Sequence, residues 1–178
     1  MLLILLFRVL LLSSFLITAY KIGDWKNRQR YYPTILFVMV VSLAESFATY
    51  HHVLWNYNPG LLVKTHTTVE FLNAFVLLPS VTFIFLSKYP FNGTRFYQSG
   101  YITLWVLIFS SIELIAHYII GSISYKNAWS WSASFILDIA LFSITRLHYS
   151  RPVWAWVFSL IVAITVLIVF DFRSGEFK

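Results

Sequence analysis

The stretch Ser110-Ser-Ile-Glu-Leu-Ile-Ala-His-Tyr-Ile-Ile-Gly121 places a glutamate and a histidine one helical turn apart among apolar residues. Residues four apart share one face of a helix, so Glu113 and His117 are expected to lie side by side. Ionisable groups are costly inside a membrane unless they find partners or water. The stretch therefore predicts the outer half of a membrane-spanning helix with one polar face.

The composition of the whole chain indicates a membrane protein. Of its 178 residues, 59% are hydrophobic and 11% are charged, whereas about 25% of a soluble domain is charged. Aromatic residues make up 20% of the chain, as expected for aromatic belts at two interfaces. The net charge of +6 lies in short gaps between apolar runs, which predicts oriented helices and no nucleic-acid binding. The absence of Cys excludes disulfides, thiol catalysis and Cys-ligated metal.

Six apolar runs are long enough to cross a bilayer, which takes about 20 helical residues. The gaps between them are too short for a soluble domain and hold no Gly-rich phosphate loop. We therefore predict an all-α, polytopic membrane protein with six transmembrane helices in one bundle, forming a single domain over residues 1–178. The predicted spans are about 2–20, 33–54, 67–86, 101–120, 128–147 and 153–172.

Basic residues concentrate in alternate gaps. The first, third and fifth gaps hold Lys21, Lys26, Arg28, Arg30, Lys88, Arg95, Arg146 and Arg151, whereas the second and fourth hold Lys64 and Lys126. The positive-inside rule then predicts a multi-pass plasma-membrane protein with loops 21–32, 87–100 and 148–152 in the cytoplasm and both termini outside. The residues expected to meet anionic headgroups at that surface are Lys26, Arg28, Arg30, Arg146 and Arg151, with His148 beside the last two.

Four acidic residues fall inside the predicted spans, at Glu45, Glu70, Glu113 and Asp138. At the rise of an α-helix, Glu45 and Glu113 lie roughly 18 Å from the cytoplasmic ends of their spans, and Asp138 lies roughly 15 Å from the outer end. These three share a level near the midplane, with Glu70 and His117 closer to the outside. Arg8, in the first span, is expected to snorkel to the surface or to pair with an acid on another helix. Pro79 is expected to kink the third span.

Helical spacing gathers the polar residues on single faces. Two Glu/His pairs are four residues apart, His66 with Glu70 and Glu113 with His117. We predict an outward-facing polar cluster formed by helices two to five. Its members are Glu45, His52, His66, Glu70, Asn73, Glu113, His117 and Asp138.

The residues around Glu45 resemble those around Glu113. Ser, Glu, Ala and Tyr recur in step at an offset of 68 residues, at positions 42, 45, 48 and 50 and again at 110, 113, 116 and 118. This similarity favours duplicated helical hairpins, although four identities in nine positions also arise by chance.

Three kinds of function fit such a cluster. In the first, the polar groups hydrogen-bond across helices and specify packing, and the protein acts through contacts with a membrane-protein partner or a second copy of itself. In the second, the acids and histidines carry protons or ions in a transporter. In the third, the protein is an enzyme that uses acid–base or metal chemistry on a lipid or isoprenoid substrate. The sequence leaves open whether the chain is an enzyme.

No cofactor is predicted outright, and a metal ion is the alternative. Carboxylates and imidazoles from several helices form metal sites in bundles, and the candidates here are Glu113, His117, Glu70 and His66. Their Glu-x-x-x-His spacing departs from the Glu-x-x-His of di-iron sites, which leaves a zinc site as the form to consider.

Two further motifs lie in the basic gaps. They are Gly23-Asp-Trp25-Lys-Asn-Arg-Gln-Arg-Tyr31-Tyr-Pro33-Thr and Arg146-Leu-His148-Tyr with Pro152 after it. In these motifs the chain resembles a family of small multi-pass membrane proteins of spore-forming Gram-positive bacteria, a family with no assigned activity. The resemblance covers most of the chain, implies a bacterial plasma membrane and supplies no mechanism.

Overall fold

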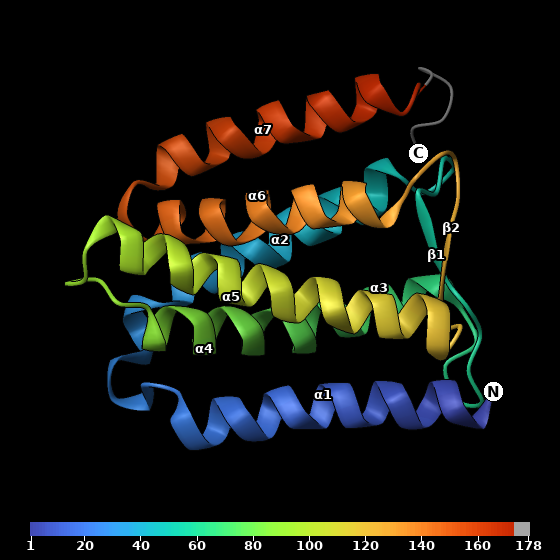
Figure 1. Ribbon diagram of the computed structural model, residues 1–178, viewed down its shortest axis with the longest axis horizontal. Helices are drawn as coiled ribbons and strands as arrows, with labels where there is room; N and C mark the ends of the chain where they lie inside the picture. Colours follow the sequence, from blue (N-terminus) through green and yellow to red (C-terminus); the bar gives the residue numbers. More distant parts are fainter. Residues whose placement is uncertain (173–178) are drawn as a thin grey trace.

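The computed structural model describes residues 1–172 and is mostly helical (Figure 1). A 3₁₀ helix, η1 (Trp25–Arg30), follows the first helix. One π-helical turn, η2 (Asn73–Leu77), joins α3 to α4, and a second, η3 (Ile115–Ile119), extends α5. The α-helices are α1 (Leu2–Ile22), α2 (Tyr32–Ala48), α3 (His66–Leu72), α4 (Leu78–Lys88), α5 (Arg95–Leu114), α6 (Trp131–Ser150) and α7 (Pro152–Val169).

Four helices are long and apolar enough to cross a membrane: Leu2–Ile22, His66–Lys88, Arg95–Ile119 and Pro152–Val169. The helix α2 is apolar but has 17 residues. It ends at Ala48 rather than at residue 54, and the amide and hydroxyl of Thr49 close its last turn on the carbonyl of Glu45. The helix α6 has 20 residues and carries Asp138, Arg146 and His148.

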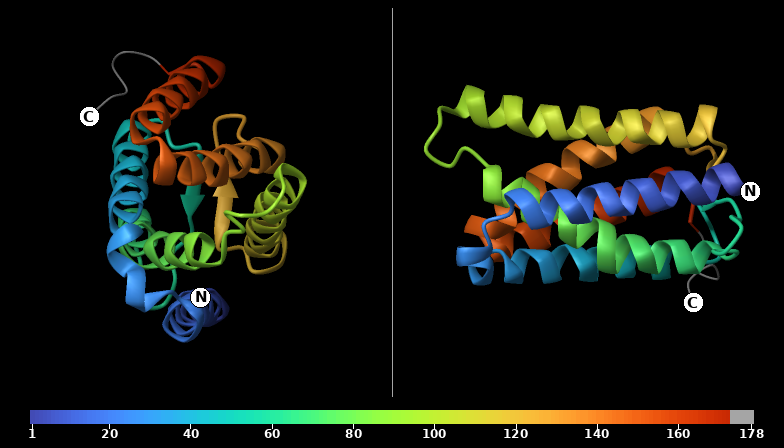
Figure 2. Two further views of the ribbon diagram at one scale, coloured as in Figure 1. Left: turned by 90° about the vertical axis from the view of Figure 1, so that its left-hand side faces the viewer. Right: turned by 90° about the horizontal axis from the view of Figure 1, so that it is seen from below.

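The helices lie lengthwise beside one another and alternate in direction (Figures 1 and 2). The helix α1 packs on α4, α5 packs on α6, and α7 packs on α6. The three connections rich in Lys and Arg lie at one end of the bundle, which we call the basic end. The N-terminus and the end of α7 lie at the opposite end (Figure 1).

A two-stranded antiparallel ribbon lies across that opposite end, which we call the ribbon end (Figure 2, left). Its strands are β1 (Trp55–Tyr57) and β2 (Ile123–Tyr125), with Asn56 opposite Ser124. The all-helical prediction missed this ribbon. Both strands are three residues long, which is too short for period-two alternation to be recognised.

The apolar core fills the bundle between the ribbon end and the basic end. Phe85 and Leu86 of α4 are 0% exposed, and Val106 of α5 and Phe142 of α6 pack in the same cluster. The continuous helix from α3 to α4 also accommodates Pro79. The amide of Leu78 bonds to the carbonyl of Asn73 in the π-helical turn just before it, and the Ser80 hydroxyl bonds to the carbonyl of Val76.

A duplicated polar cluster at the ribbon end

Polar side chains from the helices and the ribbon meet beneath the two strands. We call this set the ribbon-end cluster and divide it into two halves. The first half joins α2, β1 and α3, and the second joins α5, β2 and α6. The first half consists of Glu45, Tyr57, His66, Glu70 and Asn73, and the second consists of Glu113, His117, Tyr125 and Asp138.

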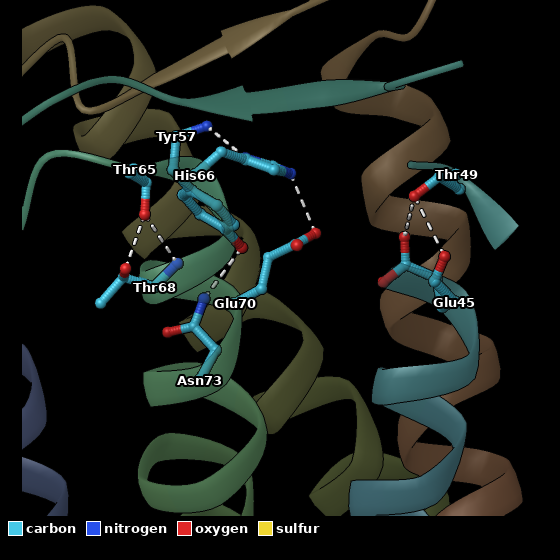
Figure 3. A network of polar contacts seen from close by, with 8 residues as sticks. All are labelled: Glu45, Thr49, Tyr57, Thr65, His66, Thr68, Glu70 and Asn73. Carbon is cyan, nitrogen blue, oxygen red and sulfur yellow. Dashed lines mark hydrogen bonds and ion pairs between the residues drawn. The ribbon is translucent and has the colours of Figure 1, made fainter. Parts of the chain in front are cut away.

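His66 connects the ribbon to α3 in the first half (Figure 3). Its Nδ1 accepts the backbone N–H of Tyr57 at 3.0 Å, and its Nε2 lies 2.9 Å from Oε1 of Glu70. Because Nδ1 accepts a hydrogen bond, the ring proton is on Nε2 and is donated to the carboxylate of Glu70. The predicted His66/Glu70 pair is therefore formed, and it also fixes the position of the strand.

The other members of the first half complete this network (Figure 3). The amide of Asn73 donates to the hydroxyl oxygen of Tyr57 at 2.9 Å. The hydroxyl of Thr49 donates to a carboxyl oxygen of Glu45 at 3.3 Å. Glu45 and Glu70 lie close enough to interact electrostatically, so α2 and α3 bring two carboxyl groups together beneath one tyrosine.

A small cavity lies among these groups. Its volume is about 20 Å³, and it is lined by Ser42, Glu45, Ser46, Trp55, Tyr57, Glu70 and Asn73. A water molecule needs about 10–15 Å³ measured in this way, together with two to four polar partners. The cavity therefore has the size and polarity for one water molecule.

In the second half, Tyr125 stands between Glu113 and His117. Its hydroxyl donates to Oε1 of Glu113 at 2.7 Å, and its ring stacks on the His117 imidazole with the ring centroids 4.1 Å apart. Nδ1 of His117 donates to the carbonyl of Ile123 at 3.0 Å. Within residues 1–172, Glu113 and His117 form no hydrogen bond or ion pair with each other, and each of them contacts the strand β2 instead.

Asp138 reaches this half from α6. Its Oδ2 accepts the hydroxyl of Ser110 at 3.2 Å, and the indole of Trp131 donates to the carbonyl of the same serine. Asp138 also interacts electrostatically with Glu113. The second half therefore also holds two carboxyl groups beneath one tyrosine.

The two halves are equivalent in sequence as well as in chemistry. Glu113, Tyr125 and Asp138 each lie 68 residues after Glu45, Tyr57 and Glu70, respectively. In the ribbon, Asn56 pairs with Ser124, which is also its counterpart at this offset. Antiparallel pairing of equivalent strands produces a local two-fold axis through the ribbon. The similarity seen around the first two glutamates thus extends through a helix, a strand and the start of the next helix.

Burial favours the neutral form of the two tyrosines. It raises the pKa of Tyr57 and of Tyr125 above their ordinary value. The nearby charge of Glu45 adds to the shift of Tyr57, and the hydrogen bond to Glu113 adds to that of Tyr125. Both hydroxyl groups therefore remain protonated at neutral pH. The sequence prediction omitted these tyrosines, although the same 68-residue offset would have found them.

Two other predicted groups lie elsewhere. His52 follows the end of α2, and its ring packs against Phe172. Arg8 is 9% exposed, and within the described residues its guanidinium forms no ion pair with an acid. Its guanidinium donates to the carbonyls of Asn58 at 2.6 Å, Ser122 at 3.4 Å and Val63 at 3.5 Å. Arg8 thereby connects α1 to the loops on both sides of the ribbon.

The four candidate metal ligands are divided between the two halves. His66 uses both ring nitrogens in the first half, and His117 uses Nδ1 in the second. Within residues 1–172, no group of three or more His, Asp or Glu side chains is arranged to hold a metal ion.

At the basic end, two predicted surface residues are packed inside. The guanidinium of Arg146 lies over the rings of Tyr89 and Phe91, 4.9 and 5.0 Å from their centroids. His148 is 6% exposed, stacks on Phe37 and hydrogen-bonds to Thr34. Residues two apart in an α-helix point to nearly opposite sides, so His148 meets α2 while Arg146 meets the segment after α4. Lys26, Arg28, Arg30 and Arg151 are exposed as expected.

No protein-family model, curated protein or solved structure matches this chain.

Proposed function

We propose that the chain is a six-pass plasma-membrane protein that acts through contacts with a membrane partner or a second copy of itself. In this proposal, the ribbon-end cluster holds the ribbon onto the bundle. The observation that carries it is the close filling of the polar interior. Each of the four carboxyl groups has a hydrogen-bond partner, and the cavity beside Glu45 and Glu70 has room for one water. Small-molecule sites in proteins occupy about 300–1,000 Å³.

The packing of α2 and α6 supports six spans rather than four. The helix α2 is shorter than α1 and α7, and α6 is less apolar than they are. The helices α2 and α6 pack on each other, α2 also packs on α4, and α6 also packs on α5 and α7. Their acids, Glu45 and Asp138, face the cluster. A helix in the middle of a bundle tolerates such residues because neighbouring helices shield them from lipid.

Single cysteines test the membrane arrangement cleanly, because the chain has none of its own. Leu62, 76% exposed, lies in the loop at the ribbon end, and Phe96, 90% exposed, begins α5 at the basic end. With the basic end in the cytoplasm, an impermeant maleimide should label Leu62→Cys in intact cells and Phe96→Cys only after permeabilisation. Labelling of both in intact cells would contradict a spanning bundle.

Glu113→Gln tests the packing role. An amide replaces part of the hydrogen bonding of a carboxyl group, so the melting temperature in detergent should fall. The hydroxyl of Tyr125 should lose its carboxylate acceptor. An unchanged melting temperature combined with lost cellular function would show that the cluster has a role other than packing.

A proton-binding role is the second candidate, and the asymmetry between the halves favours it. In the second half, Ser110 bonds directly to Asp138. In the first half, the equivalent residues Ser42 and Glu70 both line the water-sized cavity. Two carboxyl groups beside one water form a unit that can take up and release a proton.

Proteoliposomes containing a pH-sensitive dye test this candidate. Proton flux should depend on Glu45, and Glu45→Gln should abolish it. Glu113→Gln, the equivalent change in the half without the cavity, serves as the matched control and should retain flux. Absence of flux in the unmodified protein over a range of pH and solutes would remove the transport role.

A further inference from the structure

A groove of about 690 Å³ lies between α1, α2 and α4 toward the basic end. It is far from the ribbon-end cluster and shares no residue with it. Most of its surface is apolar. The residues that matter here are Leu16, Tyr20, Trp25, Arg28, Pro79 and Phe83.

The walls of the groove are fixed by specific contacts. The Trp25 indole donates to the carbonyls of Ala19 and Tyr20, both at 3.0 Å, and its ring meets the edge of Phe83 with the centroids 4.9 Å apart. Gly23 allows this approach, since a Cβ at that position would overlap the Phe83 ring and the Ala19 carbonyl. The end of α1 is thereby held against α4, and the groove remains between α1 and α2.

The depth of the groove matches one leaflet of a bilayer. Pro79 lies nine residues before Lys88, the last residue of α4, which corresponds to roughly 14 Å along the helix. The hydrocarbon core is about 30 Å thick. The groove therefore extends from the basic end to about the middle of the membrane.

The mouth of the groove carries an unpaired positive charge. Arg28 is exposed, and within residues 1–172 its guanidinium makes no hydrogen bond or ion pair. The nearest acid along the chain, Asp24, already accepts hydrogen bonds from Asn27 and Tyr31. Lys26 and Arg30 are exposed on the same short helix. A phosphate group at the mouth would meet basic groups and an unengaged guanidinium donor.

We propose that this groove binds one anionic phospholipid, with its acyl chains between α1, α2 and α4 and its phosphate on Arg28. The inference rests on the proposal that the chain spans a membrane with its basic end in the cytoplasm, where the leaflet is rich in anionic lipid. The apolar walls are as deep as one leaflet and fit the acyl chains, and the arginine at the mouth fits the anionic headgroup. A zwitterionic lipid would bind less tightly, because its headgroup carries no net negative charge.

Photo-crosslinking in proteoliposomes tests the proposal. Phosphatidylglycerol and phosphatidylcholine are prepared with the same diazirine-bearing acyl chain, and the labelled peptides are mapped by mass spectrometry. The lipid-facing helix α7, where Ile164 is 54% exposed, supplies the internal reference. On the α4 segment around Pro79 and Phe83, the ratio of phosphatidylglycerol labelling to phosphatidylcholine labelling should be about five-fold higher than the same ratio on α7. This is the effect of one Arg beside an anionic headgroup.

Two pairs of variants complete the experiment. Arg28→Gln should remove the preference at α4, whereas Arg151→Gln, an exposed arginine at the same end, should retain it. Ile35 of α2 also lines the groove. Ile35→Trp should fill the groove and abolish labelling of α4, whereas Ile164→Trp on α7 should not.

Labelling of α7 without enrichment at α4, or enrichment that survives Arg28→Gln, would overturn the inference and leave the spanning proposal standing. Absence of labelling on α7 as well would overturn the spanning proposal and the inference with it.

Discussion

The ribbon end and the basic end of the bundle are held together by different kinds of contact. At the ribbon end, a few directional hydrogen bonds join the strands to buried carboxyl groups, as in the 2.7 Å bond from Tyr125 to Glu113. At the basic end, rings pack face to face and edge to face. Tyr31 stacks on Tyr149, and Phe83 meets Tyr31 and Trp25. We call the second set the basic-end ring cluster: Trp25, Tyr31, Phe37, Phe83, Tyr89, Phe91, His148 and Tyr149.

The difference has consequences for stability and for specificity. Ring packing buries a large apolar area and depends on shape, so its loss leaves a cavity. A single hydrogen bond contributes less net free energy, because the same groups find other partners in the unfolded chain, but it fixes which groups meet. We therefore expect the basic end to dominate the free energy of unfolding and the ribbon end to determine local order.

Phe83→Ala should have the largest effect. The ring is 5% exposed and contacts both Trp25 and Tyr31, and truncation of a buried phenylalanine costs about 3–5 kcal/mol. The free energy of unfolding in mixed micelles should fall by that amount. Phe96→Ala, at a 90% exposed position, is the matched control and should change little. A small effect at Phe83 would mean that the basic end is not the main source of stability.

Arg8→Met should be the most damaging change at the ribbon end. It removes the 2.6 Å hydrogen bond to the carbonyl of Asn58 and the longer contact to Ser122, whose carbonyl keeps the N–H of Asn58. An unsatisfied buried group costs about 1–3 kcal/mol. Hydrogen exchange should become faster in the loops around β1 and β2 and remain slow in α4. Faster exchange throughout the bundle would show that the two ends are one cooperative unit.

Tyr125→Phe should have a smaller effect, of roughly 0.6–1.7 kcal/mol, the range for hydrogen bonds between membrane helices. Tyr57→Phe is the equivalent change in the first half and should cost a similar amount. Tyr118→Phe, at a 70% exposed tyrosine, controls for the hydroxyl alone. Melting temperatures in detergent provide the measurement, and unequal losses for Tyr57 and Tyr125 would show that the two halves differ in function.

The sequence predicted a mostly helical chain because long apolar runs are a strong signal. The four acids in these runs were conspicuous in the sequence, and the structure places each of them on a helix at partial exposure. It did not predict the ring cluster. Arg146 and His148 were expected at the surface because of their charge. The rings that they contact, those of Tyr89, Phe91 and Phe37, lie far away in the sequence and meet them only after three separate segments have folded together.

The ribbon was missed for a related reason. Strands of three residues carry little periodicity, and the pairing of β1 with β2 joins residues 66 to 70 apart in the sequence. The π-helical turn at Ile115–Ile119 likewise has no composition of its own, yet it contains His117, which binds the strand β2. The repeat was the one signal that reached across such distances, and extending it to Tyr57 and Tyr125 would have located the centre of each half.

Asp24→Asn should have the smallest effect, and it connects the basic end to pH. Hydrogen bonds from Asn27 and Tyr31 lower the pKa of Asp24 below its ordinary 3.8. A lowered pKa means that the carboxylate stabilises the fold above 3.8 and that this contribution is lost as the pH falls through the folded-state pKa. The stability of the unmodified protein should therefore fall more steeply below that pH than the stability of Asp24→Asn.

On the alkaline side, burial and the bond to Asp24 raise the pKa of Tyr31 to about 12. The Tyr31 contribution is accordingly present in full below its ordinary pKa of 10.0 and is lost as the pH rises from there through about 12. Unfolding followed as a function of pH, with Tyr31→Phe as the partner variant, measures both limbs. Identical acid limbs for the unmodified protein and Asp24→Asn would show that rings alone hold the basic end.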